Sequence, residues 1–309
     1  MTRFFLKATT PRFVWGVVAV ASLAQACSDG LGPLAPRSSP ASTASIAFVS
    51  SGVDSVSHIY VLDLDHSTVT QLTHGAVWDD APAWSPDRRS IAFLRGGDSS
   101  TAGIWLMAAD GSGAVRLTSL PGVATWSPDG RKMAVMSRNS ITIMNTDGSG
   151  VVGVIGKLPG LMWYSGAAAW SPDGSTIAFT FFGEPPGCWG RCQWVVLMNP
   201  DGSNVRPVTT TFSRQYGAAW SPDGRRLAFR SLEFGITVVN RDGSGAFSVT
   251  KERPENWGSP DWSPEGDRLV FSDWSGGQPQ LVVTRADGTG AVHPVTALPY
   301  GDGDPAWSR

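Results

Sequence analysis

One short segment recurs along the chain, and it constrains the fold more than any other feature. It reads "AAWSPDGSTIAF" at 168–179 and returns with small changes at 82–93, 125–135, 218–229 and 261–271, while the chain ends in a shortened copy, "PAWSR". The Trp of the repeat falls at positions 84, 126, 170, 220, 262 and 307, so its spacing runs from 42 to 50 residues. A repeat of this length is typical of the blades of a β-propeller.

Each repeat predicts four short strands joined by tight turns. The first strand ends in Trp-Ser, a Pro-Asp-Gly turn follows, and the second strand carries "IAF". A third strand such as 104–107, an Asp-Gly turn such as 110–111 and a fourth strand such as 115–118 complete the unit. Pro presets φ in such turns, Gly accepts a positive φ, and Asp-Gly between strands is the usual hairpin signal. The alternative, a calcium loop, would need a spaced third carboxylate and a distal Glu that these turns lack.

The two ends of the chain complement each other. The first unit opens at 45–50 with a second-type strand and has no first strand, whereas 304–308 ("DPAWS") is a first strand with nothing after it. Pairing them would complete a sixth blade and remove the exposed strand edges of an open array. We therefore predict an all-β fold, a six-bladed β-propeller over 45–309, closed by pairing of the C-terminal strand with the N-terminal blade. The repeated Trp residues are expected to pack between blades rather than to stack on a ligand.

These repeats resemble those of the TolB-type six-bladed propellers and, more widely, WD-like propeller repeats. The resemblance covers residues 45–309 and implies the fold more than a function. TolB itself carries a separate α/β domain before its propeller, whereas only a short segment precedes the repeats here. The resemblance therefore does not extend to the role of TolB in the Tol system.

Residues 1–26 have the order of an export signal. Arg3, Lys7 and Arg12 precede an apolar run at 13–24, which small residues follow. This basic, apolar and small-residue order marks a signal peptide, and the apolar run is too short to stay in a bilayer as a helix. Residues 27–44 lack an apolar period and read as a flexible tether.

Two cleavage interpretations remain open at "AQAC". An ordinary signal peptidase would leave Cys27 as the first residue of a secreted protein. The same residues resemble a bacterial lipobox, although Ala24 stands where that motif prefers Leu. A free terminal thiol is unusual in an exported protein, which favours lipidation of Cys27. Ser28 and Asp29 differ from the pattern of inner-membrane retention, so the resemblance implies an outer-membrane lipoprotein that faces the periplasm or the surface.

The remaining composition excludes several classes of function. Without residues 1–26, the chain has 21 Lys and Arg against 26 Asp and Glu, and no basic face is concentrated enough for nucleic acid. The sequence contains no G-x-S-x-G elbow, no H-E-x-x-H motif and no Gly-rich phosphate loop. We assign no catalytic residue, no metal ligand and no cofactor, and we expect a monomeric propeller.

The segment "CWGRC" holds Cys188 and Cys192 in the longest repeat. In an exported protein, two nearby cysteines favour a disulfide. A zinc site would need two further ligands, and no His is close in the sequence.

The binding face is expected on the rim opposite the Pro-Asp-Gly turns. Loops there differ in every copy, for example at 96–103, 188–192 and 272–279, and variable loops on a rigid scaffold commonly carry binding. Small residues stand just before each Trp, where strands crowd at the axis. Further upstream lie the candidate residues of a channel mouth: Trp78, Asp79, Asp80, Trp163, Tyr164, Arg214, Tyr216, Trp257, Tyr300, Asp302 and Asp304.

Closure of the ring would bring the acidic candidates together. Asp302 and Asp304 would lie beside Asp79 and Asp80, with Asp261 on the other neighbouring blade. An aromatic mouth with an acidic sector suits a cationic, peptide or sugar ligand. The alternative is that these are ordinary solvated loop residues.

Three functions follow from this arrangement. The first is a non-catalytic binding or scaffold module of the cell envelope that presents a propeller face to a protein or peptide partner. The second is a metal-dependent propeller hydrolase or lactonase whose channel carboxylates hold a metal such as calcium, which would also need an open coordination position and a base. The third is a purely structural surface protein.

Overall fold

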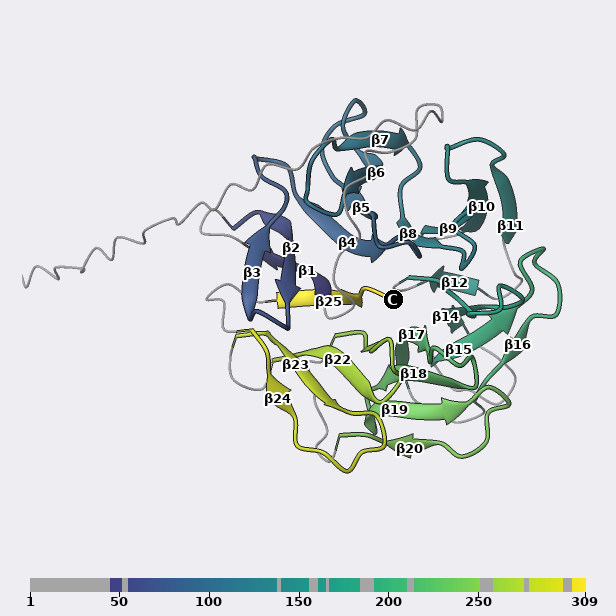
Figure 1. The fold of residues 1–309 in the computed structure, drawn as a ribbon. Coiled ribbons are helices and arrows are strands. Elements are labelled where there is room, and N and C mark those ends of the chain that lie inside the picture. Colours follow the sequence, from purple (N-terminus) through teal and green to yellow (C-terminus); the bar gives the residue numbers. More distant parts are fainter. Residues whose placement is uncertain are drawn as a thin grey trace, which may run out of the picture. The chain divides into compact units, whose positions relative to one another are not determined.

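A computed structural model of the chain shows six antiparallel sheets arranged around a common axis (Figure 1). The structure describes residues 45–51, 55–137, 140–155, 161–164, 167–183, 192–209, 214–250, 258–274, 278–296 and 302–309. Among these residues, no helix is long and apolar enough to cross a membrane. The signal peptide 1–26, the tether 27–44 and the lipidation site Cys27 lie outside the described residues, so those predictions stay untested.

Each blade is a sheet whose successive strands are ordered outward from the axis. The first two blades along the ring contain β25 (Asp302–Trp307), β1 (Ser45–Ser51), β2 (Ser57–Asp63) and β3 (Thr68–Gln71), then β4 (Asp79–Trp84), β5 (Ser90–Arg95), β6 (Gly103–Ala108) and β7 (Val115–Thr118). The next two contain β8 (Val123–Trp126), β9 (Lys132–Ser137), β10 (Ser140–Asn145) and β11 (Val152–Ile155), then β12 (Leu161–Tyr164), β13 (Ala169–Trp170), β14 (Ile177–Gly183), β15 (Cys192–Met198) and β16 (Arg206–Pro207). The last two contain β17 (Gln215–Trp220), β18 (Arg226–Ser231), β19 (Gly235–Asn240) and β20 (Phe247–Ser248), then β21 (Asp261–Trp262), β22 (Arg268–Asp273), β23 (Gln280–Arg285) and β24 (His293–Pro294).

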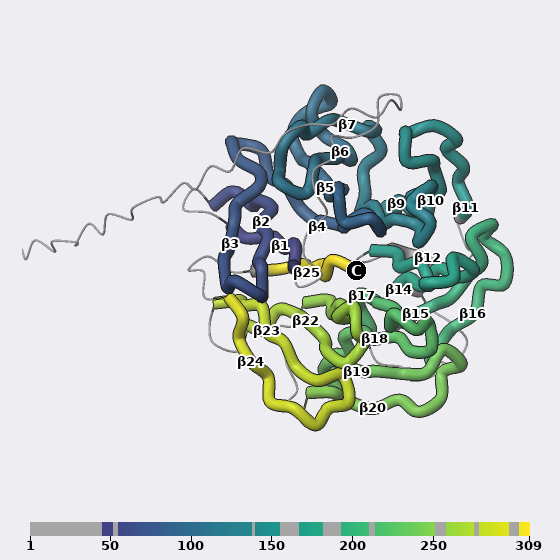
Figure 2. The backbone as a smooth tube through the Cα atoms, viewed as in Figure 1, coloured from purple at the N-terminus to yellow at the C-terminus, as the bar shows by residue number. Residues whose placement is uncertain are grey.

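The predicted closure of the ring is confirmed. The last strand, β25, pairs antiparallel with the first, β1, and Trp307 lies opposite Ile46 in the register. Trp307 is 5% exposed and packs in one cluster with Phe48, and the Ser308 N–H donates to the Ser45 carbonyl at 2.9 Å. Figure 2 shows the two ends of the colour scale side by side in this blade. The six-bladed all-β fold is therefore as the repeats predict.

The hydrophobic core lies between adjacent blades. Trp262, for example, is fully buried and packs with Phe271 of its own blade and Ala228 of the preceding one. The indole N–H groups of three repeat tryptophans reach the preceding blade, each donating to the carbonyl of the residue before that blade's own Trp: Trp126 to Ala83, Trp220 to Ala169 and Trp262 to Ala219, all at 3.1 Å. The Trp residues thus hold neighbouring blades in register, as expected from their role in packing.

The Ser of Trp-Ser-Pro-Asp-Gly has a role of its own in each turn. In the fourth copy, the Ser221 hydroxyl donates to the Asp223 carboxylate at 2.5 Å and accepts the N–H of Arg226 at 2.9 Å. This hydroxyl bond is the main cause that lowers the pKa of Asp223. The fifth copy has Glu265 in place of Asp, and there the Ser263 hydroxyl turns to Asp267 at 3.1 Å instead.

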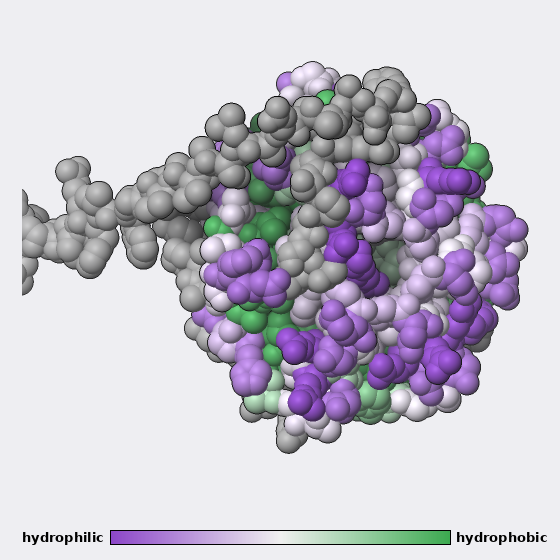
Figure 3. All heavy atoms as spheres, in the orientation of Figure 1, coloured by the Kyte–Doolittle hydropathy of each residue, from purple (hydrophilic) through white to green (hydrophobic). Residues whose placement is uncertain are grey.

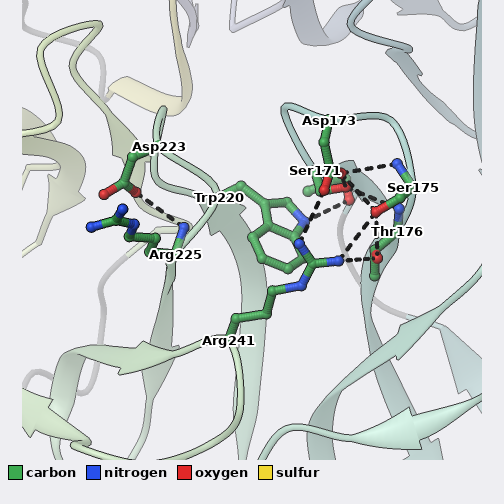
Figure 4. A network of polar contacts seen from close by, with 9 residues as sticks. Ser171, Asp173, Ser175, Thr176, Trp220, Asp223, Arg225 and Arg241 are labelled. Carbon is green, nitrogen blue, oxygen red and sulfur yellow. Dashed lines mark hydrogen bonds and ion pairs between the residues drawn. The ribbon is translucent and has the colours of Figure 1, made fainter.

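The turns also join one blade to the next. Figure 4 shows Arg241 reaching from its own blade to the turn of the preceding blade. Its guanidinium donates to Asp173 at 3.1 Å and to the Thr176 hydroxyl at 2.7 Å, and it lies 5.3 Å from the Trp220 ring centroid. A cation over an indole that also meets a carboxylate stabilises the contact between the two blades.

The Asp-Gly pairs form the hairpin turns that the sequence predicts. Asp242 is representative, because its carboxylate accepts both the N–H and the hydroxyl of Ser244, at 2.9 and 2.6 Å. The same pattern occurs at Asp110, Asp201 and Asp287. These carboxylates are engaged within their own turns, as a hairpin requires.

Candidate functional site

A cavity of about 520 Å³ lies on the axis of the ring, and the first strand of every blade contributes to its wall. On the face shown in Figure 3, the surface is hollowed near the centre, close to the point where Figure 2 marks the C-terminus. Ligand cavities in proteins commonly measure about 300–1,000 Å³, so this volume suits a small molecule or an inserted side chain.

Small residues line the cavity because six strands converge there. The third residue before each Trp forms one level of the wall: Ala81, Val123, Ala167, Gly217, Ser259 and Asp304. At Gly217, where φ is +53°, a Cβ atom would lie 1.9 Å from the Ser259 hydroxyl oxygen, so this strand approaches its neighbour too closely for any side chain. The crowding near the axis that we expected from the small residues before the Trp is therefore present at Gly217.

A β-bulge turns this level of residues out of the sheet. Two residues of the first strand lie opposite one residue of the second in three blades, at Ala81–Pro82, Gly217–Ala218 and Asp304–Pro305. The first residue of each pair has a positive φ, which is +51° at Ala81 and +44° at Asp304. A bulge redirects a side chain in this way, and here the redirected residue lines the cavity.

The charged residues of the cavity wall come from two adjacent blades. They are Asp304 on β25, Asp261 on β21 and Arg309, which follows β25. Arg309 occupies the position that Pro holds in the other copies of the repeat, because the last copy reads Trp-Ser-Arg. The rest of the described wall consists of Ala, Pro and Trp with few polar side chains, so the cavity is apolar on one side and charged on the other.

Asp261 and Arg309 neutralise each other. The Arg309 guanidinium contacts the Asp261 carboxylate and also donates to the Trp220 carbonyl at 3.1 Å. The same carboxylate accepts the backbone N–H groups of Trp262 and Trp307, at 2.9 and 2.8 Å. Asp261 is therefore an organising residue that ties the closing strand to the adjacent blade.

Asp304, which lines the cavity, and the neighbouring Asp80 form a pair of carboxylates. Asp80 lies at the mouth end of β4, where its carboxylate accepts the N–H of Ala81 at 2.8 Å. Asp304 keeps solvent access through the cavity, yet protein surrounds it on the wall, and this burial is the main cause that raises its pKa to about 6. The charge of Asp80 and a hydrogen bond between the two side chains raise the pKa further. The predicted meeting of these two acids across the closed ring is thus present.

Asp79 has a different environment from Asp80. Its side chain is fully buried and receives two hydrogen bonds from the Arg95 guanidinium, at 2.6 and 2.8 Å. Arg95 is held between two rings, 5.1 Å from the Phe93 centroid and 4.6 Å from that of Trp105. A bidentate pair of this kind is a structural feature, and it leaves no Asp79 oxygen facing the cavity.

Three other predicted site residues lie on the rim. Trp78 is 45% exposed, and its ring lies so close to Gly96 that a Cβ atom there would clash with the indole. Arg214 is exposed just before β17. Tyr216, on β17, is half-buried beneath the Arg230 guanidinium, which lies 5.2 Å from the ring centroid.

The remaining predicted residues have no described side chain. Trp163 and Tyr164 lie in β12, whose backbone pairs with Phe182 and Phe181 of β14, and the backbone of Asp302 pairs with Ser50. Trp257, Tyr300 and Cys188 lie outside the described residues, and of Cys192 only the backbone in β15 is described. The mouth composed of these residues and the disulfide between the two cysteines stay predictions.

One of the variable rim loops is described in full, and it is well ordered by its own hydrogen bonds. In the loop at 96–103, the Asp98 carboxylate accepts the N–H groups of Ser100 and Thr101. Arg116 on β7 donates to three carbonyls of this loop, those of Ser99, Ser100 and Ala102. Such a loop can present its surface without a large ordering cost on binding.

Within the part of the chain that the structure describes, no group of three or more His, Cys, Asp and Glu side chains is arranged to hold a metal ion. Of the four carboxylates considered for the metal-dependent alternative, Asp79 is paired with Arg95, and the side chain of Asp302 is not described. The described residues therefore offer two carboxylates, Asp80 and Asp304, whereas calcium takes six to eight oxygen ligands, roughly.

Two residues of the site were not identified from the sequence. The partner of Asp79, Arg95, is sixteen residues away, and only the register of β4 and β5 brings the two together. Arg309 carried a usable signal, because it stands where five copies of the repeat have Pro.

Comparison with known proteins agrees with this architecture. Residues 28–152 match the family described as the TolB beta propeller domain. Two curated proteins are similar over short segments. The uncharacterized peptidase YuxL of Bacillus subtilis (strain 168) is 34% identical over 82 residues, which are 26% of this chain and 12% of that protein. The uncharacterized protein Atu1656 of Agrobacterium fabrum (strain C58 / ATCC 33970) is 38% identical over 91 residues, which are 27% of this chain and 29% of that protein.

Among solved structures, TolB from Acinetobacter baumannii superposes with a TM-score of 0.69. The superposition covers 86% of this chain and 66% of that one, with 21% sequence identity. This likeness concerns the fold, whereas the family match rests on the repeat sequence itself. The resemblance to TolB-type six-bladed propellers that the repeats predict is therefore confirmed.

Proposed function

We propose that this protein is a non-catalytic binding module of the cell envelope that presents its channel mouth and loop-bearing rim to a protein or peptide partner. The observation that carries this proposal is the axial cavity of about 520 Å³, with apolar walls and, on one side, Asp304, which interacts with Asp80. Apolar cavities with a few convergent polar groups are the usual form of binding sites. The ordered loop at 96–103 and the exposed Trp78 add a rigid surface on the rim.

The proposed location rests on the sequence before the propeller. The export signal at 1–26 would deliver the chain to the envelope, and lipidation of Cys27 would anchor it to the outer membrane through the tether at 27–44. An oxidising compartment would also favour the Cys188–Cys192 disulfide. Mass spectrometry of membrane-extracted protein should find a lipid-modified Cys27, and an unmodified Cys27 on membrane-free protein would refute the anchor.

A hydrolase is not proposed. The similarity to a protein named as a peptidase covers 12% of that protein, which is too little to carry its activity over to this chain. The metal-dependent alternative asks for carboxylates free to bind a cation, and Asp79 is already bound by Arg95.

The proposal is tested by affinity capture from an envelope extract with the immobilised mature protein. The test variant carries Ala at Trp78, Trp163, Tyr216 and Trp257, and it should lose capture of proteins that the parent retains. The matched control is Phe247→Ala, which removes an exposed aromatic ring from the outer strand β20 and should leave capture unchanged. Equal capture by both variants, with unchanged melting temperatures, would rule out the aromatic rim as the binding face.

A further inference from the structure

The wall of the cavity is mostly apolar, but it also carries a carboxylate, Asp304. Ala, Pro and Trp residues of the six inner strands line most of the cavity. Such walls suit an apolar body, because burying apolar surface is favourable by about 25 cal/mol per Å². A wholly apolar ligand, however, would bring no cation to Asp304, the carboxylate that lines the cavity beside Asp80.

Among the described residues near the cavity, two acids have a basic partner. Arg309 contacts Asp261, and Arg95 binds Asp79 through two hydrogen bonds. Asp304 instead interacts with Asp80, a group of the same sign. Two carboxylates that share one site disfavour each other's ionisation, and a cation placed between them would relieve this repulsion.

The form of the cation follows from the groups present. Two carboxylates are few for a calcium ion, which takes six to eight oxygen ligands, roughly. An ammonium group has three donors, so it can bond to both carboxylates and keep one donor for water. From the cavity, its walls and its paired carboxylates, we propose that the axial cavity binds a primary ammonium group carried on an apolar stem, with Asp304 and Asp80 as its counter-ions.

This inference rests on the proposed function and gives the chemistry that the cavity recognises. The same chemistry occurs in a free alkylamine and in a lysine side chain of a partner peptide, where four methylene groups form the stem. The cavity admits the stem along its apolar walls, and the ammonium group reaches the level of Asp304, three residues before the Trp.

Binding should depend on pH in a defined direction. The pKa of Asp304 is raised to about 6, so acidification through that value protonates a counter-ion and weakens the binding of a cation. The other charged groups on the strands packed around Asp304 are Asp80, Asp79, Arg95, Asp261, Arg309, Arg268, Asp273 and Arg285; β1 carries none.

The experiment uses the mature protein and calorimetric titration at pH 7.5 or thereabouts. The probes are 4-phenylbutylamine, its neutral analogue 4-phenylbutan-1-ol, and two end-blocked pentapeptides, Ala-Ala-Lys-Ala-Ala and the same peptide with norleucine in place of Lys. The alcohol should bind at least about tenfold more weakly than the amine, since the loss of a charged hydrogen bond is worth roughly that factor. A preference for the lysine peptide over its norleucine form identifies a peptide source, whereas binding of the free amine alone identifies a small-molecule source.

Two variants localise the site. Asp304→Asn keeps the shape of the side chain and should weaken amine binding by about tenfold. The pH dependence of amine binding should also become weaker in this variant. The control Asp242→Asn removes an acid of the hairpin turns and should leave amine binding as in the parent. Equal binding of amine and alcohol, an unchanged affinity in Asp304→Asn, or no binding of either cationic probe at millimolar concentration would overturn the inference. None of these results bears on envelope capture through the rim aromatics, so the two proposals can fail separately.

Discussion

The blade that closes the ring and the blade that contains β17 to β20 have the same four-stranded form but different origins. The second is contiguous in sequence, whereas the first takes its inner strand, β25, from the other end of the chain. At the bulge, the contiguous blade has Gly217 and the closing blade has Asp304; after the Trp-Ser pair, one has Pro222 and the other Arg309. Both substitutions place charge on the axis, so the strand that completes the ring also supplies most of the polarity of its cavity.

Removal of the closing strand should destabilise the protein more than any other change considered. Deletion of residues 304–309 removes Trp307 from its cluster with Phe48 and leaves the inner edge of β1 unpaired. Truncation of a buried aromatic residue alone costs about 3–5 kcal/mol, against a total stability of roughly 5–15 kcal/mol. We expect a protein that melts far below the parent and aggregates, as judged by thermal unfolding and light scattering.

The control for this deletion removes Arg309 alone. That shorter deletion keeps the whole β25–β1 ladder, and it should lower the melting temperature only slightly. If the loss of 304–309 also changes the melting temperature by only about a degree or two, the closing strand does not stabilise the ring.

Equivalent tryptophans of the two blades give the next comparison. Trp220→Ala and Trp307→Ala should each cost about 3–5 kcal/mol in chemical denaturation. We expect the larger loss at Trp220, because its side chain is fully buried, whereas Trp307 is 5% exposed. A clearly larger loss at Trp307 would mean that closure of the ring outweighs this difference in burial.

The two blades also differ in how much room the residue at the bulge has for a side chain. Gly217→Ala should destabilise the protein by about 1–3 kcal/mol, since the new Cβ atom meets Ser259 in a backbone conformation that L-residues avoid. Asp304→Ala, at the matching position, already has room for a Cβ atom and should be tolerated. Denaturant titration of the two variants gives both values, and equal effects would contradict the difference in fit.

The smallest effect is a pH dependence of stability that belongs to the closing blade. The pKa of Asp304 is about 6 in the folded protein and 3.8 for an ordinary Asp, so between these values the folded state holds a proton that the unfolded state has released. Stability should therefore fall as the pH rises from about 4 to about 6. Acids of the turns have lowered pKa values, as at Asp129 and Asp223, and their contribution is lost only at lower pH.

Thermal melts of the parent and of Asp304→Asn across this range isolate the effect. As the pH rises, the melting temperature of the variant should increase steadily relative to that of the parent. This difference should level off above the pKa of Asp304. Parallel curves for both proteins would show that Asp304 titrates normally.

The sequence predicts much of this fold because its signals are local and repeated. Trp-Ser-Pro-Asp-Gly specifies a strand end and a turn in each copy, and the unmatched strands at 45–50 and 304–308 indicate how the ring closes. Even the meeting of Asp80 and Asp304 follows from that closure. These features depend on the order of strands and on little else.

The roles of neighbouring acids could not be predicted in the same way. Asp79 and Asp80 are adjacent in sequence, but one is buried against Arg95 and the other faces Asp304 across the blade boundary. Which of them points inward depends on the register of β4 and β5 and on the bulge that follows Asp80. The repeat pattern contains no residue that marks this bulge in every copy, since Ala81, Gly217 and Asp304 all occupy it.

The split blade also has a consequence for the order of folding. Five blades form from neighbouring segments, but Ser45 must wait for Ser308 before the ladder between them can form. Contacts between residues so far apart in sequence form slowly, because the entropy lost on closing a long loop precedes the gain from pairing. Until β25 pairs with β1, the sheet of β1 to β3 has one open edge. We therefore expect closure of the ring to come late in folding, and the aggregation risk of that open edge to end with it.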